Sequence, residues 1–318
     1  MNEFWYQLRR GAIYAVSLLP FSTLYAISDA LYPIVFHIVR YRRRIVEKNL
    51  RNSFPEMSDA ERYDVEKRFY RSFCDSTVEM FKLLSISRDE LMQHMTFSGI
   101  DDVNKSLETH PQCFLYLGHF CNWEWISSMP LWFRPDVLGT QLYHPMHSKF
   151  FNRLFLEMRT RFGAENIRKT EALRRLLTLK AEKRKTVVGF ISDQTPRWVN
   201  IHDWVTFMNQ DTPVYTGTER IAKKIGAAVF FANVECLSRG HYHCSLELMT
   251  NDVGSYPDYK LTEEYMARLE QMIRRRPESW LWTHNRWKRS RTNAPQTEDR
   301  HNIQATPAGS TGTSDKPI

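Results

Sequence analysis

The segment that most limits the possible folds is a short apolar run that breaks abruptly into a polar turn. Residues 114–117 read Phe-Leu-Tyr-Leu, which is typical of a buried strand, and Gly118 ends the run. From Trp123 onward the apolar residues follow helical spacing. His119 therefore lies in a turn between the end of a strand and the start of a helix. In α/β proteins such turns carry functional residues.

A second buried-strand signal strengthens this interpretation. Residues 186–192 read Thr-Val-Val-Gly-Phe-Ile-Ser, and Asp193 and Gln194 follow directly. Polar residues at the ends of parallel strands gather at one edge of a sheet. We therefore expect Asp193 and Gln194 to position a substrate or to brace the His119 turn, the simpler alternative being that Asp193 caps a helix or turn. The alternation of strand and helix patterns predicts an α/β fold.

His119 and Glu124 are a candidate pair for acid–base chemistry. On one continuous helix, residues five apart point about 140° away from each other, so the two side chains would not meet. If His119 instead lies in the turn and Glu124 in the first helical turn, the carboxylate can bond one imidazole nitrogen and leave the other free. The turn has no serine, and Cys121 is its only nucleophilic side chain. A base acting on a substrate hydroxyl therefore fits better than an acyl-enzyme, and a hydrogen-bonded structural histidine is the alternative.

The charge of the chain indicates an anionic partner. The formal net charge is +8, which suits nucleic acid, phospholipid headgroups, or a phosphorylated or acidic-carrier substrate. We find no nucleic-acid-binding motif, so no nucleic-acid partner is expected. The five cysteines include no Cys-x-x-Cys pair, which favours reduced thiols and argues against a metal site.

Several basic side chains are candidates for binding phosphate or an acidic carrier. Arg197 follows the second strand, and Arg220 lies in a segment with helical spacing that ends at Gly226. A basic amphipathic helix is expected over about 150–162, and it places four candidates close together: Lys149, Arg153, Arg159 and Arg161. A solvated helix face is the alternative for these four residues.

The N-terminal part contains the one long apolar stretch, residues 11–39. Its interior carries a single formal charge, Asp29, and is interrupted by Pro20 and Pro33. The length permits a membrane span, the prolines and the aspartate permit a bent helix in the interface, and a buried hairpin is the third alternative. More cations follow this stretch than precede it, which predicts that the bulk of the protein lies on the cytoplasmic side.

Three separated motifs resemble a known family. Gly-His-Phe-Cys-Asn-Trp-Glu at 118–124, Asp-Gln at 193–194 and Trp-x-Trp-x-x-x-Arg-Trp-Lys at 280–288 are similar to motifs of the lipid A biosynthesis acyltransferases. These are the late lauroyl and myristoyl transferases of Gram-negative bacteria, within the wider His-x4-Asp/Glu acyltransferase group. Cys121 stands where that family usually has Gly, and His144 stands where Arg is common.

The resemblance implies a central mixed sheet flanked by helices. It also implies a membrane anchor at 1–40, an acyltransferase domain at 41–289 and a location at the bacterial inner membrane. The tail, 290–318, has too few large apolar residues to order itself and is expected to be disordered.

The resemblance also implies the chemistry. The acyl donor would be an acyl carrier protein, the acceptor a hydroxyl of a lipid A precursor among membrane lipids, and no cofactor would be needed. His119 would be the general base, oriented by Glu124, while backbone amides near Asn122 would stabilise the oxyanion. Expected substrate contacts are Asn122, Lys149, Asp193, Gln194, Arg197 and Arg220. A lysophospholipid, aminolipid or glycolipid acceptor is the open alternative, and a non-enzymatic, basic membrane-bound nucleic-acid binder is the less favoured one.

Overall fold

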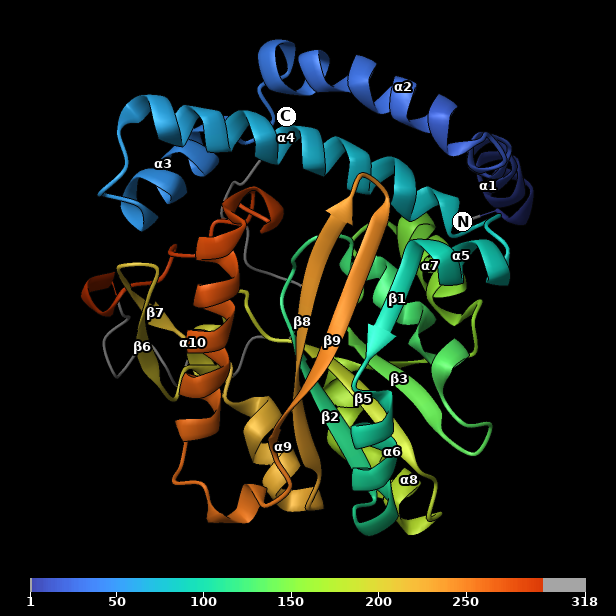
Figure 1. The fold of residues 1–318 in the computed structure, drawn as a ribbon, viewed down its shortest axis with the longest axis vertical. Helices are drawn as coiled ribbons and strands as arrows, with labels where there is room; N and C mark the ends of the chain where they lie inside the picture. Colours follow the sequence, from blue (N-terminus) through green and yellow to red (C-terminus); the bar gives the residue numbers. More distant parts are fainter. Residues whose placement is uncertain (1, 294–318) are drawn as a thin grey trace.

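The protein is described by a computed structural model that covers residues 2–293. Its centre is a seven-stranded sheet in the order β1-β9-β8-β2-β5-β3-β4 (Figure 1). The strands are β1 (Met95–Ser98), β2 (Gln112–Leu117), β3 (Leu138–Tyr143), β4 (Glu165–Arg168), β5 (Thr186–Ile191), β8 (Ala228–Ser238) and β9 (His241–Thr250). β8 and β9 pair antiparallel, whereas β2 runs parallel to β5 and β8, and β3 runs parallel to β4 and β5. The predicted α/β fold with a mixed sheet is confirmed.

The register of two neighbouring strands positions the candidate site. All six residues of β2 are buried, so both faces of this strand are covered. β2 pairs with β5 so that Leu117 lies opposite Ile191, the last residues of the two strands. His119 and Asp193 each follow two residues later. The sheet therefore brings these two residues to the same edge.

Helices flank the sheet on both sides. They are α1 (Glu3–Ser17), α2 (Phe21–Pro33), α3 (Arg43–Ser53), α4 (Asp59–Lys82), α5 (Arg88–His94), α6 (Ile100–Thr109), α7 (Lys149–Thr160), α8 (Ala172–Ala181), α9 (Gly217–Ile225) and α10 (Lys260–Arg275). The helix that follows the His119 turn is a 3-10 helix, Trp123–Trp132, which contains Pro130. A small antiparallel sheet pairs β6 (Trp204–Phe207) with β7 (Gln210–Pro213).

The 24-residue helix α4 covers the end of the sheet from which the β8–β9 hairpin projects (Figure 1). Ser58 and Glu61 form a reciprocal capping box at its start, because each side chain bonds the backbone N–H of the other residue. Its buried face carries apolar side chains such as Val65 and Phe69, but also Glu79.

The N-terminal helices pack against α4 through polar contacts. Tyr25 and Ser28 of α2 donate hydrogen bonds to Glu79 and Asp75, and Asp29 pairs with Arg239 at 2.6 Å. A π-helical segment, Ile34–Ile38, continues α2. In residues 2–293 no single helix is long and apolar enough to cross a membrane. Only α1 and the continued α2, which meet at 107°, reach that length and composition together.

The expected tail falls almost wholly outside the described residues. Of the range 290–318, only the first four residues belong to the part that the structure describes, and Arg291–Asn293 form a 3-10 turn.

Candidate active site

His119 is held at two atoms by one buried carboxylate. Its backbone N–H donates to Asp193 Oδ2 at 2.8 Å, and its ring Nδ1 bonds Asp193 Oδ1 at 2.6 Å. The His119 side chain is 19% exposed, whereas that of Asp193 is 2% exposed. The imidazole is therefore fixed on its inner side and reaches solvent on its outer side.

Asp193 is ionised at neutral pH. Burial opposes ionisation, but the charge of His119 and hydrogen bonds from His119 and Trp280 outweigh it and lower the pKa of Asp193 to about 2. The indole Nε1 of Trp280 donates to Asp193 Oδ2 at 2.8 Å. A carboxylate can only accept at His119 Nδ1, so Nδ1 carries the proton and Nε2 is left as the basic nitrogen.

Gln194 lies at that basic nitrogen. Its side-chain Nε2 is 3.2 Å from His119 Nε2, so the amide donates to the imidazole. Asp193 and Gln194, which sequence motifs place side by side, thus contact the two ring nitrogens of His119. The expectation that this pair braces the His119 turn matches the hydrogen bonds of the structure.

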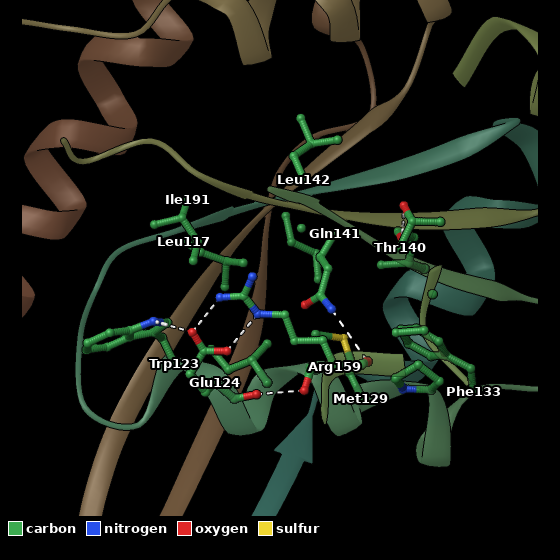
Figure 2. Close-up of a pocket in the computed structure, with 18 residues that line it drawn as sticks. Leu117, Trp123, Glu124, Met129, Phe133, Thr140, Gln141, Leu142, Arg159 and Ile191 are labelled. Atoms are coloured by element: carbon green, nitrogen blue, oxygen red, sulfur yellow. Dashed lines mark hydrogen bonds and ion pairs between the residues drawn. The ribbon is translucent and has the colours of Figure 1, made fainter. Parts of the chain in front are cut away.

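The expected contact between Glu124 and His119 is not formed, and this part of the sequence-based hypothesis is wrong. Glu124 instead makes a bidentate ion pair with Arg159, at 2.6 and 2.8 Å, and accepts from the indole of Trp123 at 3.2 Å (Figure 2). Because the last residues of β2 and β5 lie opposite each other, Asp193 reaches Nδ1 of His119. The 3-10 helix instead directs Glu124 toward Arg159 of α7. Burial disfavours the Glu124 carboxylate, but Arg159 outweighs this and the pKa of Glu124 is lowered.

The turn itself is held by the C-terminal segment. Cys121 N–H donates to Ser279 O at 2.8 Å, and Leu281 N–H donates to His119 O at 3.1 Å. Cys121 has a φ of +50°, a left-handed conformation that glycine adopts most easily. Burial raises the pKa of the Cys121 thiol far above its ordinary range, so the thiol is poorly suited to act as a nucleophile.

The Asn122 side chain is buried and bonds a carboxylate of α4. Its amide donates to Glu79 Oε2 at 2.9 Å, and the same carboxylate accepts from the hydroxyls of Tyr25 and Tyr242. One of the two amide hydrogens of Asn122 is therefore used to tie the turn to Glu79 of α4. Glu79 itself was overlooked at sequence level. The available signal was an acidic residue directly beside Val78, within a stretch of helically spaced apolar residues.

The expected basic contacts separate into two groups. Lys149, Arg197 and Arg220 are exposed, and Arg220 contacts His202 at 3.3 Å. No contact in residues 2–293 joins any of these three to His119. Three other basic side chains, on α7 or directly after it, make contacts within the protein: Arg159 binds Glu124, Arg153 binds Glu3 and Glu157, and Arg161 donates to the carbonyls of Leu83 and Ile86. Of the four basic candidates in this segment, Lys149 at the start of α7 stays exposed.

Two cavities adjoin the 119–124 turn, and both include Trp123 and Glu124 in their walls. A narrow cavity of about 60 Å³ lies beneath Arg159 and is lined by Leu117, Ile126, Met129, Phe133, Leu142 and Ile191 (Figure 2). A larger, mainly apolar groove of about 400 Å³ runs between α4 and the C-terminal segment. It is lined by Phe69, Phe73, Met80, Phe155, Trp280 and Leu281. Within the described residues, no group of three or more His, Cys, Asp or Glu side chains is arranged to hold a metal ion.

A histidine fixed by a buried carboxylate at the ends of two parallel strands, next to apolar cavities, has the geometry of a general-base enzyme with an apolar substrate. The sequence profile of the bacterial lipid A biosynthesis acyltransferases matches residues 2–289, and the chain belongs to this family. The family indicates an acyltransferase that uses an acyl donor and a lipid A precursor. A comparison with curated proteins finds no match.

Proposed function

We propose that the protein transfers a fatty acyl chain from an acyl carrier protein thioester to a hydroxyl of a lipid A precursor, in the secondary acylation of lipopolysaccharide biosynthesis. It would act at the cytoplasmic face of the bacterial inner membrane, with residues 1–40 as anchor and 41–289 as catalytic domain. The observation that carries the proposal is the hydrogen-bonded pair of His119 and Asp193, which leaves His119 Nε2 as the base.

The acceptor hydroxyl takes the place of the Gln194 amide at His119 Nε2. His119 removes its proton as the hydroxyl oxygen attacks the thioester carbonyl carbon. The tetrahedral intermediate then collapses, the carbon–sulfur bond breaks, and the imidazolium returns the proton to the leaving thiolate. Asp193 stabilises the imidazolium during this sequence, as the buried carboxylate does in hydrolase triads.

The other groups of the site position the reactants. Backbone amides at the start of the 3-10 helix, near Asn122 and Trp123, stabilise the negative charge on the carbonyl oxygen. The exposed cations Lys149, Arg197 and Arg220 suit the acidic surface of the carrier protein or phosphates of the acceptor. The chemistry requires no metal or organic cofactor.

The test is an acyl-transfer assay in detergent with acyl carrier protein as donor and a tetra-acylated lipid A precursor as acceptor. His119→Ala should lower kcat by about 10²–10⁴-fold, the usual contribution of a positioned base. His110→Ala is the control, because His110 precedes β2 and lies at the end of that strand opposite to His119. Full activity in His119→Ala would refute the mechanism. Transfer only to a lysophospholipid would preserve the chemistry and refute the acceptor.

A further inference from the structure

The groove between α4 and the C-terminal segment opens beside a turn with unusual surface chemistry. In this turn, residues 38–44, Ile38 and Val39 are 75% and 57% exposed. The next residues include the exposed cations Arg40, Arg42 and Arg44. Large exposed apolar side chains beside cations are typical of a surface that meets the polar–apolar boundary of an anionic bilayer.

The turn and the groove are physically joined through Tyr41 and Arg42. Tyr41 lines the groove, and its ring stacks on Phe73 of α4 with centroids 5.9 Å apart. Arg42 donates to the carbonyl of Thr283, another residue of the groove wall, at 3.1 Å. Arg40 and Arg44 have no ion-pair partner in residues 2–293. Two cations that form no ion pair in residues 2–293 therefore lie within three residues of Tyr41, which lines the apolar groove.

We propose that this groove binds an acyl chain of the lipid acceptor, which enters from the bilayer while Arg40 and Arg44 hold its anionic headgroup. The inference rests on the proposed function and names the subsite for the acceptor. Cys121, Asn122 and Trp123 line the groove, so a chain lying in it contacts the His119 turn.

One property of the groove favours the acceptor over the donor. The acceptor is a membrane lipid, and Tyr41 of the apolar and basic 38–44 turn lines the groove, whereas the donor arrives on a soluble carrier. Two further properties suit an acyl chain in general. The lining is mainly apolar, and the volume of about 400 Å³ lies within the usual range for ligand sites, while the cavity beneath Arg159 has only about 60 Å³.

The groove can be filled without removing a described contact. Ser72 and Ser76 lie one helical turn apart on the face of α4 that lines the groove, and both are half-buried. Ser76→Phe places an aromatic ring in the space assigned to the chain, and Ser72→Phe is a second variant in case the first does not fold. Thr178→Phe is the matched control, because Thr178 lies on the exposed face of α8, at the opposite end of the molecule from α4 (Figure 1).

We expect Ser76→Phe to raise the KM for the lipid A precursor at least about tenfold and to leave the KM for the acyl carrier protein donor within about twofold. Thr178→Phe should change neither value. A rise in the donor KM alone would assign the groove to the donor and overturn the inference. Unchanged KM values for both substrates in a folded variant would also overturn it.

The headgroup contact has its own test. Arg40→Glu/Arg44→Glu should weaken binding of a bisphosphorylated precursor at least about tenfold, since each cation near an anionic lipid surface contributes roughly fivefold. Binding of the dephosphorylated lipid should change little. Arg174→Glu/Arg184→Glu, which reverses two exposed arginines in and just after α8, is the charge-matched control. Equal losses for both lipids would refute the assignment of the two arginines to the headgroup.

A direct binding measurement separates this inference from the proposed function. A lipid A precursor with a photoactivatable acyl chain should label the α4 peptide that contains residues 69–80 in the wild type, and labelling should disappear in Ser76→Phe. Labelling without acyl transfer would support the groove and refute the proposed function. Transfer with labelling only outside the groove would support the function and overturn the groove.

Discussion

Asp193→Asn tests which carboxyl group orients the base. In the wild type, Asp193 accepts from His119 Nδ1 at 2.6 Å, from the His119 backbone at 2.8 Å and from Trp280 at 2.8 Å. An asparagine of the same shape presents one oxygen and one NH2 group. If the NH2 group faces Nδ1, the imidazole must take the tautomer with its proton on Nε2, and the base is lost.

The structure sets the expected size of two effects of Asp193→Asn, the loss of catalysis and the loss of folding stability. The same change in a serine-protease triad lowers kcat about 10⁴-fold, so we expect a loss on the order of 10³–10⁴-fold here. Because the pKa of Asp193 is about 2 rather than the ordinary 3.8, its ionised form stabilises the fold by about 2 kcal/mol at neutral pH. In the wild type this contribution is present above about pH 4 and is lost as the pH falls toward 2.

The assay combines acyl transfer with urea unfolding at pH 7, and Asp136→Asn, an exposed aspartate, is the control. Asp193→Asn should lose transfer while the folded fraction stays high under assay conditions. If Asp193→Asn keeps more than a tenth of the activity and Glu124→Gln abolishes it, Glu124 orients His119 and the reasoning above is wrong.

Three further predictions concern the surroundings of the base. Glu124→Gln should lower the free energy of unfolding by about 3 kcal/mol in urea titrations, because Arg159 is left without its counter-charge. An unchanged midpoint would contradict that pairing. Cys121→Gly should keep full transfer activity, since the thiol does no chemistry and glycine readily adopts a φ of +50°. Complete loss in a folded variant would point to the thiol. Burial raises the pKa of Glu79 to about 6, so the native state holds a proton between pH 4.5 and about 6 that the unfolded chain releases. The free energy of unfolding of the wild type minus that of Glu79→Gln should therefore fall by about 2 kcal/mol from pH 4 to pH 7. A difference that does not change with pH would refute the raised pKa.

Local patterns in the sequence predicted much of the architecture. The apolar runs at 114–117 and 186–192 correspond to β2 and β5, and the helix expected over about 150–162 corresponds to α7. These features depend on residues close together in the chain, whose apolar periodicity determines strands and helices. The same reasoning placed His119 in a turn at a strand end.

The partners of the charged groups were harder to predict. The five-residue spacing made Glu124 a natural partner for His119, yet Asp193, 74 residues away in the chain, occupies Nδ1. Arg159 on α7 was interpreted as a possible solvent-exposed cation, but it neutralises Glu124. A spacing pattern cannot identify such partners, because they depend on which strands are neighbours and on how those strands are aligned.

The sequence by itself determined the class of fold, the position of His119 and the motifs that indicate the acyltransferase family. The tertiary structure decided that Asp193 orients the base, that Glu79 accepts a hydrogen bond from Asn122 of the 119–124 turn, and that an apolar groove joins the 38–44 turn to the site. The physical reason is that strands and caps arise from local interactions, whereas a buried carboxylate must find its partners among residues that only the packed sheet and helices bring within hydrogen-bond distance.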